Sequence, residues 1–174
     1  MDTIKFKVSV VNKIDKTLCL ELLVNGKNIL EWKENGAVYT TQYDLSDIVD
    51  YFILNTVEFA NNSDDFPYDI TANNLLELAD ICYSKEFDDE DEEIEFFENI
   101  HEYFYNHTIG HASGGAIIAN LYFRHVDDYM EISWDNSDEE QEFTNKKCVV
   151  FISVNEYLEA VWDLKNQYNK LIKD

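Results

Sequence analysis

Residues 107–134, HTIGHASGGAIIANLYFRHVDDYMEISW, contain the only Gly-Gly pair and the only arginine of the chain. The apolar run 116–125 predicts a buried strand, 126–128 predicts a turn, and the alternation over 129–134 predicts the partner strand of a hairpin. The glycine pair lets the chain turn sharply before the hairpin. The arginine, alone among acidic residues, is expected to hold a carboxylate in a bidentate pair that fixes the hairpin to an acidic helix. Four residues form this structural signature: Gly114, Gly115, Arg124 and Trp134.

Two Asn-Gly pairs lie upstream and predict tight hairpins, because a type I′ turn needs positive φ at two successive residues. They are Asn25-Gly26 and Asn35-Gly36. The alternation from Ile4 to Val10 is typical of a half-buried strand. The expected strands of this antiparallel meander are 4–10, 17–24, 28–33 and 37–43.

Helical spacing of apolar residues follows the meander. One helix is expected from Asp44 or Ser46 to Asn61, and a second after Thr71. A third should run from Glu92 to about His107, with an inward stripe of Ile94, Phe97, Ile100, His101 and Phe104. A short strand over 148–152 precedes a last helix, which Ser153 and Glu156 open as a capping box.

These elements predict an α+β fold, in which an antiparallel N-terminal β-meander and a later β-hairpin pack against about four α-helices. The chain has 174 residues, of which 45% are hydrophobic. This length and content suit a single domain over 1–174 with its own core.

The formal net charge is −23, and it is unevenly distributed. Residues 34–123 contain 20 acidic residues against one basic residue, Lys85, whereas the first 33 residues are slightly basic. Such a charge repels nucleic acid and anionic membranes and attracts basic partners. The candidate partner-binding residues form one dense cluster and a second patch: Glu86, Asp88, Asp89, Glu90, Asp91, Glu92, Glu93 and Glu95, then Asp138, Glu139 and Glu140.

Two interpretations of this acidity remain open. Closely spaced carboxylates can imitate the phosphates of DNA and occupy the basic cleft of a nuclease or another nucleic-acid-binding protein. Alternatively, the carboxylates form a solvated face that only keeps the protein soluble. Calcium binding is disfavoured, because the acidic run lacks the glycine and the alternating ligands of an EF-hand loop.

The three cysteines, Cys19, Cys82 and Cys148, are far apart and form no CxxC motif. Each lies in an apolar run, which predicts buried free thiols and a reducing cytosol. The N-terminus shows no signal pattern, and no apolar run is long enough to span a bilayer. A cytoplasmic protein without membrane contact is therefore expected.

Catalytic motifs are weak. His107 and His111 have a spacing that could place two imidazoles on one helical face, but the zinc-hydrolase motif HExxH is absent. Ser113 precedes Gly-Gly without the GxSxG pattern of a nucleophile elbow. No catalytic residue, metal or cofactor is expected, although a metal-dependent hydrolase at the two histidines remains as a third possibility.

The segment 107–134 resembles a family of bacterial proteins whose pattern is His, Gly-Gly, an apolar strand, Phe-Arg-Arg, a Gly-Asp turn and Glu-x-Ser-Trp. The matching residues are His107 or His111, Gly114, Gly115, Phe123, Arg124, Asp128 and Glu131–Trp134, with Val24–Gly26 and Phe66-Pro67 upstream. Ala119, His125 and Asp127 depart from the pattern, where the family has Pro, Arg and Gly. The resemblance implies a prokaryotic or phage protein related to domains found beside ImmA/IrrE-like metallopeptidases in defence or stress-response genes. It implies no activity.

The charge makes a non-enzymatic, acidic protein-binding module the first functional hypothesis. Such a module would be an inhibitor, immunity or anti-defence protein that blocks a basic, nucleic-acid-binding partner. The alternative is a defence- or stress-linked regulatory domain that acts through the segment 107–134.

Overall fold

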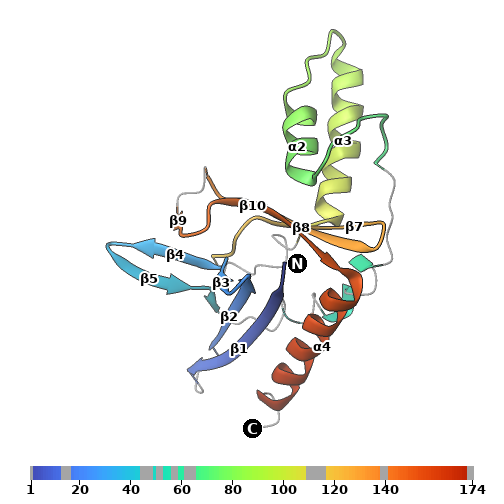
Figure 1. Ribbon diagram of the computed structural model, residues 1–174. Coiled ribbons are helices and arrows are strands. Elements are labelled where there is room, and N and C mark those ends of the chain that lie inside the picture. The colour runs from blue at the N-terminus through green and yellow to red at the C-terminus, as the bar shows by residue number, and fades with distance from the viewer. Residues whose placement is uncertain are drawn as a thin grey trace.

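The computed structural model describes residues 2–12, 17–43, 49, 53–55, 59–60, 66–108, 117–137 and 141–171. Its strands form three antiparallel sheets, which together with the helices confirm the predicted α+β class. In the first sheet β2 (Thr17–Val24) pairs with three strands: β1 (Ile4–Asn12), β3 (Lys27–Asn28) and β6 (Gln42–Tyr43). The second sheet has the order β5-β4-β9: β4 (Glu31–Glu34), β5 (Ala37–Thr40) and β9 (Glu142–Phe143). The third has the order β10-β8-β7: β7 (Leu121–Val126), β8 (Tyr129–Asp135) and β10 (Lys147–Ser153). The helices labelled in Figure 1 are α2 (Leu75–Tyr83), α3 (Glu90–Asn106) and α4 (Val154–Leu171).

Both Asn-Gly pairs form the predicted tight turns. Asn25 and Gly26 have φ angles of 50° and 78°, and Asn35 and Gly36 have φ angles of 51° and 80°. Positive φ at both central residues is the type I′ geometry whose twist suits a hairpin. The two turns join β2 to β3 and β4 to β5.

The meander does not continue as one sheet, so the predicted strands 28–33 and 37–43 are wrong in extent. The chain turns at Ile29-Leu30, and both side chains are buried. Asn28 Oδ1 accepts hydrogen bonds from the backbone amides of Leu22 and Leu30, at 3.3 and 3.1 Å. The Asn28 side chain thus takes the place of strand-to-strand hydrogen bonds at the point where the chain passes from the first sheet to the second. The strand predicted over 37–43 breaks at Thr41, between β5 and β6, where Thr41 N donates to Leu30 O at 3.2 Å and Thr41 O accepts from Leu20 N at 3.0 Å.

The predicted hairpin forms, with β7 paired to β8 from Leu121↔Trp134 to Val126↔Tyr129. Its first strand begins at Leu121 rather than at residue 116, and Asp127 in the turn has a φ angle of 53°. β10 adds to the other side of β8. Glu142 and Phe143 form β9, a short strand that pairs with β4 and that no alternation in the sequence predicts.

The helix predicted over 44–61 agrees with the helical residues 49, 53–55 and 59–60, and the rest of that span lies outside the described residues. α2 is capped by Asn74 rather than by Thr71. α3 begins at Glu90, earlier than predicted, because the Asp89 carboxylate accepts from the amides of Asp91 and Glu92, both at 3.0 Å. One of the two hydrogen bonds of the predicted capping box of α4 is present, since Glu156 N donates to Ser153 Oγ at 3.2 Å.

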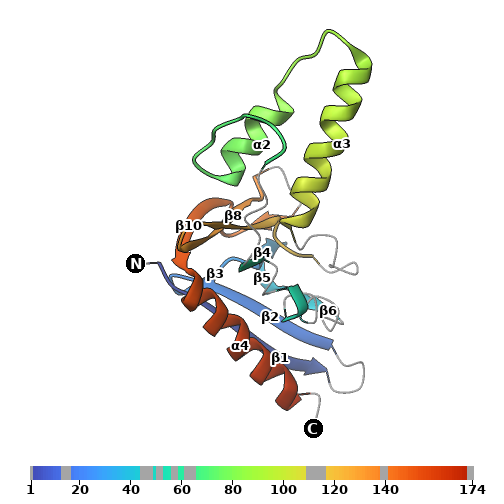
Figure 2. The ribbon, with the colours of Figure 1, turned by 90° about the vertical axis from the view of Figure 1, so that its right-hand side faces the viewer.

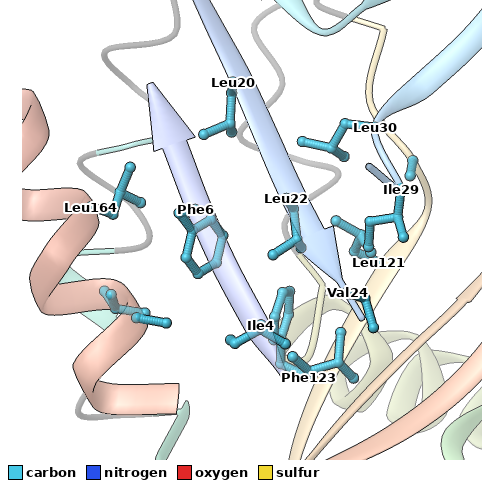
Figure 3. Packing of buried hydrophobic residues seen from close by; sticks show 14 of the residues in the cluster. Ile4, Phe6, Leu20, Leu22, Val24, Ile29, Leu30, Leu121, Phe123 and Leu164 are labelled. Atoms are coloured by element: carbon cyan, nitrogen blue, oxygen red, sulfur yellow. The ribbon is translucent and has the colours of Figure 1, made fainter. Parts of the chain in front are cut away.

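The main hydrophobic cluster combines the first and third sheets with α4. Figure 3 shows Phe6 and Leu22 of the first sheet gathered with Phe123 of β7 and Leu164 of α4. α4 also covers the open edge of β1, because Gln167 accepts from Val8 N at 3.1 Å and donates to Phe6 O at 2.9 Å. Pairing an edge strand with a side-chain amide removes a site of unwanted strand addition.

A second hydrophobic cluster forms between α2 and α3 and is separate from the first. Figures 1 and 2 show these two helices standing out from the sheets. We call residues 66–108 the α2–α3 projection. Because the chain has two separate hydrophobic clusters, the prediction of a single domain over 1–174 stays a prediction. Within the described residues, no helix has the length and apolarity needed to cross a membrane.

The three thiols differ in environment, which corrects the expectation that all are buried. Cys19 and Cys82 are buried, and burial raises the pKa of both thiols. Cys148 is exposed at the start of the edge strand β10, outside both clusters.

We expect an aromatic disulfide reagent at pH 8 to modify Cys148 rapidly in the folded protein. Cys19 and Cys82 should react only after denaturation, because a buried thiol with a raised pKa supplies little accessible thiolate. Absorbance of the released thiolate counts the modified groups, and Cys148→Ser should abolish the rapid phase. Rapid modification of a second cysteine would contradict the burial of Cys19 or Cys82.

Candidate functional site

The α2–α3 projection is built on an aromatic core. Tyr68 lies against Phe96 with ring centroids 4.6 Å apart, and Phe66 meets Tyr103 edge-on at 5.0 Å. Phe87, in the turn between the helices, meets Phe96 at 5.0 Å. Such ring pairs contribute about 0.5–1.5 kcal/mol each beyond area burial. These rings and the buried α2 side chains lie in one cluster, which holds α2, the turn and α3 together as one body.

A buried ion pair attaches the projection to the hairpin at the start of α2. Arg124 on β7 contacts Glu131 Oε2 on β8, with Nη2 at 2.7 Å and Nε at 2.9 Å. The other oxygen of Glu131 accepts from the backbone amide of Leu75, the first residue of α2, at 2.6 Å. The Glu131 side chain is 0% exposed and that of Arg124 is 18% exposed.

The expectation that Arg124 itself pairs with a carboxylate of an acidic helix is wrong. The arginine pairs across the hairpin, and Glu131 makes the link to the helix. Nη2 and Nε of Arg124 contact the same carboxylate oxygen, so the pair is not a bidentate fork. Glu131 enters the sequence analysis only as part of the family pattern, and this link was not predicted. Its signal is a single acid between Met130 and Ile132, directly opposite Arg124 in the hairpin register.

His107 attaches the projection at the end of α3. Its Nδ1 lies 2.7 Å from Tyr103 O, and its ring lies 4.2 Å from the Tyr103 ring. Its backbone carbonyl accepts from Phe123 N of β7 at 2.8 Å. The buried imidazole is thus a helix C-cap and a packing group, which agrees with a structural role for this histidine.

Trp134 is buried and donates from Nε1 to Asn145 O at 3.0 Å. The remaining signature residues, Gly114 and Gly115, lie outside the described residues, as do His111 and Ser113. Within the described part of the chain, no three His, Cys, Asp or Glu side chains are grouped to hold a metal ion.

The candidate acidic cluster lies at the outer end of the projection. We call it the acidic tip: Glu86, Asp88, Asp89, Glu90, Asp91, Glu92, Glu93 and Glu95. All eight residues are exposed, and none forms an ion pair with a cation among the described residues. Figures 1 and 2 place the α2–α3 turn and the start of α3 at the end farthest from the sheets.

Lys85, next to the acidic tip, does not neutralise it by an ion pair. Its ammonium lies over the rings of Phe96, Phe87 and Tyr68, at 4.2, 4.7 and 5.9 Å from their centroids. A cation over the face of an aromatic ring is held by the ring quadrupole. The lysine thus packs on the aromatic core, and the carboxylates of the acidic tip face solvent.

The carboxylates continue along α3 at a density comparable to that of nucleic acid. Seven acidic residues lie between Glu90 and Glu102. At 1.5 Å per residue they span about 18 Å, or about one charge per 2.6 Å. Duplex DNA carries about one charge per 1.7 Å of its axis.

The predicted inward stripe of α3 is only partly correct, because two of its residues are exposed. The buried face consists of Phe96, Ile100, Tyr103 and Phe104, whereas Ile94 and His101 are exposed and Phe97 is half-buried. Ile94 and His101 therefore belong to a second, outward stripe. A shallow groove of about 660 Å³ follows this outward face, lined by Glu90, Glu93, Ile94, Phe97, Glu98, His101 and Glu102.

The second predicted acidic patch, Asp138 to Glu140, lies outside the described residues. Beside it, Asp135 is paired with Lys147 at 2.7 Å. Burial alone would raise the pKa of Asp135, but the contacts with Lys147 and Ser137 outweigh it and lower the pKa. This carboxylate is used in the fold and not offered to a partner.

Comparison with protein-family models, with curated proteins and with solved structures finds no match to this chain. The resemblance over residues 107–134 therefore stays a prediction.

Proposed function

We propose that this chain is a non-enzymatic, acidic protein-binding module that occupies the basic, nucleic-acid-binding surface of a partner protein. It acts as an inhibitor, immunity or anti-defence protein by competing with nucleic acid for that surface. The observation that carries the proposal is the acidic tip, in which eight exposed carboxylates without a cationic partner among the described residues stand on a separately packed projection.

Electrostatics and shape both support this proposal. Concentrated like charge raises the association rate with an oppositely charged surface and excludes partners of the same sign. The start of α2 and the end of α3 attach the projection to the hairpin through Glu131 and His107, and the Phe104 ring meets Tyr122 of β7 at 6.0 Å. A protruding body of this kind can enter a concave basic cleft, which a flat acidic face cannot do.

The carboxylate density supports competition with nucleic acid in particular. A cleft that neutralises the phosphates of a duplex can neutralise a track of about two-thirds that charge density in a similar way.

The proposal is tested by capture from a nuclease-treated lysate, followed by measurements on the purified partner. The captured protein should bind labelled duplex DNA or RNA, and the chain should displace that ligand. The test variant Glu86→Gln/Asp91→Asn/Glu92→Gln should weaken capture about tenfold or more at about 0.1 M salt, where charges interact over about 10 Å. It keeps Asp89, so the cap of α3 is retained.

The matched control is Glu34→Gln/Asp128→Asn/Glu159→Gln, which removes the same charges from exposed positions on other elements. It should bind the partner like the wild-type chain. If both variants weakened capture of the partner equally, binding would depend on the total charge of the chain and not on the acidic tip. Capture of no basic partner, or simultaneous binding of chain and nucleic acid, would overturn the proposal.

A further inference from the structure

β10 forms one edge of the third sheet. It pairs with β8 over all seven of its residues, from Lys147↔Asp135 to Ser153↔Tyr129, and among the described residues no strand pairs with its other side. Residues 149–152, VVFI, are β-branched or aromatic, and the register of the strand has no shift. Such residues favour an extended chain. A long, regular and apolar strand edge of this kind pairs readily with another strand.

The other strand edges of the described chain are protected or short. The Gln167 side chain of α4 forms hydrogen bonds with the edge of β1. The backbone of His107 and Thr108 lies along the edge of β7, through a hydrogen bond and an isolated bridge. The remaining edge strands, β3, β5, β6 and β9, have two or four residues each. Covering an edge and keeping it short are the usual protections against strand addition, and β10 has neither among the described residues.

The hydrogen bonds at the two ends of the β10–β8 ladder show which backbone groups of β10 point away from β8. Asn136 N donates to Lys146 O at 2.6 Å, and Val154 N donates to Asp128 O at 3.1 Å. In an antiparallel ladder, hydrogen-bonded pairs alternate with pairs that are not hydrogen-bonded. The even-numbered residues of β10 therefore bond to β8, and the odd-numbered residues point their N–H and C=O groups toward the open edge.

Val149 and Phe151 thus present two N–H and two C=O groups at this edge. The contact that the described residues make with them is a thiol hydrogen bond from Cys148 Sγ to Val149 O at 3.8 Å. A thiol is a weak donor. Donors and acceptors that repeat every second residue match the backbone of another strand. The chemistry of this edge therefore specifies a strand as its occupant.

We infer that β10 pairs with β10 of a second copy of this chain, antiparallel and about a two-fold axis at Val150. Full overlap of the two strands sets Val149 opposite Phe151 of the second copy, and Phe151 opposite Val149. Each of these pairs exchanges two hydrogen bonds, because both residues point their backbone groups toward the open edge. The sheet β7-β8-β10 then continues into its copy as one antiparallel sheet. The inference does not depend on the proposed function.

The charges at the two ends of β10 are complementary in this arrangement. Residues 146–154 contain two lysines and no acidic residue, in a chain of net charge −23. Full overlap sets Lys146 opposite Val154 of the second copy, and Val154 is bonded to Asp128. Lys146 and Asp128 of the second copy, both exposed, then lie in one row, two strand spacings or about 10 Å apart. The two-fold symmetry repeats this attraction at the other end.

Other occupants satisfy the edge less well. A helix uses its backbone groups internally, so it cannot pair with those of Val149 and Phe151. A strand from the basic partner of the proposed function would bring further positive charge to Lys146 and Lys147, and like charges side by side on neighbouring strands are destabilising. The second copy supplies Asp128 at this place, and its own β10 gains partners for the same backbone groups.

Charge-swap variants test the pairing. The wild-type chain should be a dimer that dissociates on dilution, measured by light scattering against the 20.5 kDa mass of one chain. Val149→Lys/Phe151→Lys should be monomeric, because lysines would face each other in both pairs, and Val149→Glu/Phe151→Glu should be monomeric for the same reason. An equimolar mixture of the two variants should restore the dimer, since each Lys then faces a Glu. Val38→Lys/Tyr39→Lys adds the same charge at exposed positions of β5 and should dimerise like the wild-type chain. Circular dichroism should show all variants folded.

Disulfide trapping tests the register. In the inferred dimer, Val150 of the two copies forms the pair at the axis that is not hydrogen-bonded, with Cα atoms about 4.5 Å apart, a separation that a disulfide can span. Val150→Cys in a Cys148→Ser background should therefore cross-link on mild oxidation. The wild-type chain is the matched control. Its Cys148 lies opposite Ile152 of the second copy, so the two Cys148 residues are four positions, or about 14 Å, apart along the strand and cannot be bridged.

A wild-type chain that stays monomeric at every concentration would overturn the inference. So would a dimer that survives Val149→Lys/Phe151→Lys, or a mixture of the two folded charge variants that stays monomeric. Protection of the Val149 and Phe151 amides from hydrogen exchange only when the captured partner is added would assign the edge to a strand of that partner, and would also overturn it. The acidic-tip variant Glu86→Gln/Asp91→Asn/Glu92→Gln should dimerise like the wild-type chain, so this inference and the proposed function fail independently.

Discussion

Glu131→Ala is expected to lower the free energy of unfolding by about 3–5 kcal/mol, the range measured when one partner of a buried ion pair is removed. The substitution leaves the largely buried Arg124 guanidinium without its carboxylate. It also leaves the amide of Leu75, at the start of α2, without its acceptor. Urea unfolding followed by circular dichroism measures the loss, and amide hydrogen exchange should show the first turn of α2 opening.

Two controls separate the ion pair from the hydrogen bond. Glu131→Gln keeps an oxygen for Leu75 and removes the charge, so its loss should be smaller, about 1–3 kcal/mol. Glu21→Ala breaks the surface pair with Lys7, whose side chains are 33% and 50% exposed, and should lose no more than about 1 kcal/mol. If Glu131→Ala were no more destabilising than Glu21→Ala, the link between hairpin and projection would be wrong.

Asn28→Ala is expected to cost about 2–3 kcal/mol, because an unsatisfied buried polar group costs about 1–3 kcal/mol. Asn28 Oδ1 accepts from the amides of Leu22 and Leu30, and Nδ2 donates to Thr40 Oγ1 at 2.7 Å. Removal of the side chain leaves both amides without this acceptor where the chain passes from the first sheet to the second. Urea unfolding measures the loss.

Asn28→Asp is the matched variant, since it keeps the acceptor oxygen while it replaces the donor to Thr40 by a charged carboxylate oxygen. It should retain more stability than Asn28→Ala. Faster exchange of the Leu22 and Leu30 amides in Asn28→Ala, and not in Asn28→Asp, would assign the effect to the two accepted hydrogen bonds. Equal stability of both variants would show that the side chain does not hold this junction.

Local chemistry explains the parts of the fold that could be predicted. Asn-Gly pairs favour positive φ whatever surrounds them, so both hairpins were predictable from Asn25-Gly26 and Asn35-Gly36. Ser153 and Glu156 cap α4 through contacts within four residues, and Val126 to Tyr129 closes the hairpin in the same local way. The acidic tip was also readable, since a run of carboxylates is solvated wherever it lies.

The face that each element buries depended on contacts distant in sequence. The apolar residues of α3 lie all around the helix, so periodicity alone could not decide between Ile94 and Phe96 as core. The rings of Tyr68 and Phe87 decided for Phe96, and Ile94 was left outside. β9 likewise forms by pairing with β4, which is distant in sequence.

The sequence by itself determined the turns, the helix caps, the α+β class and the concentration of negative charge in the segment that becomes the projection. Only the tertiary structure decided that this charge stands on a separate aromatic core, that Glu131 links it to the hairpin, and that a second apolar stripe of α3 faces outward. The physical reason is the range of the interactions. Turns and caps are satisfied by neighbours in the chain, whereas a buried carboxylate and the choice of a buried helix face depend on partners that only folding brings together.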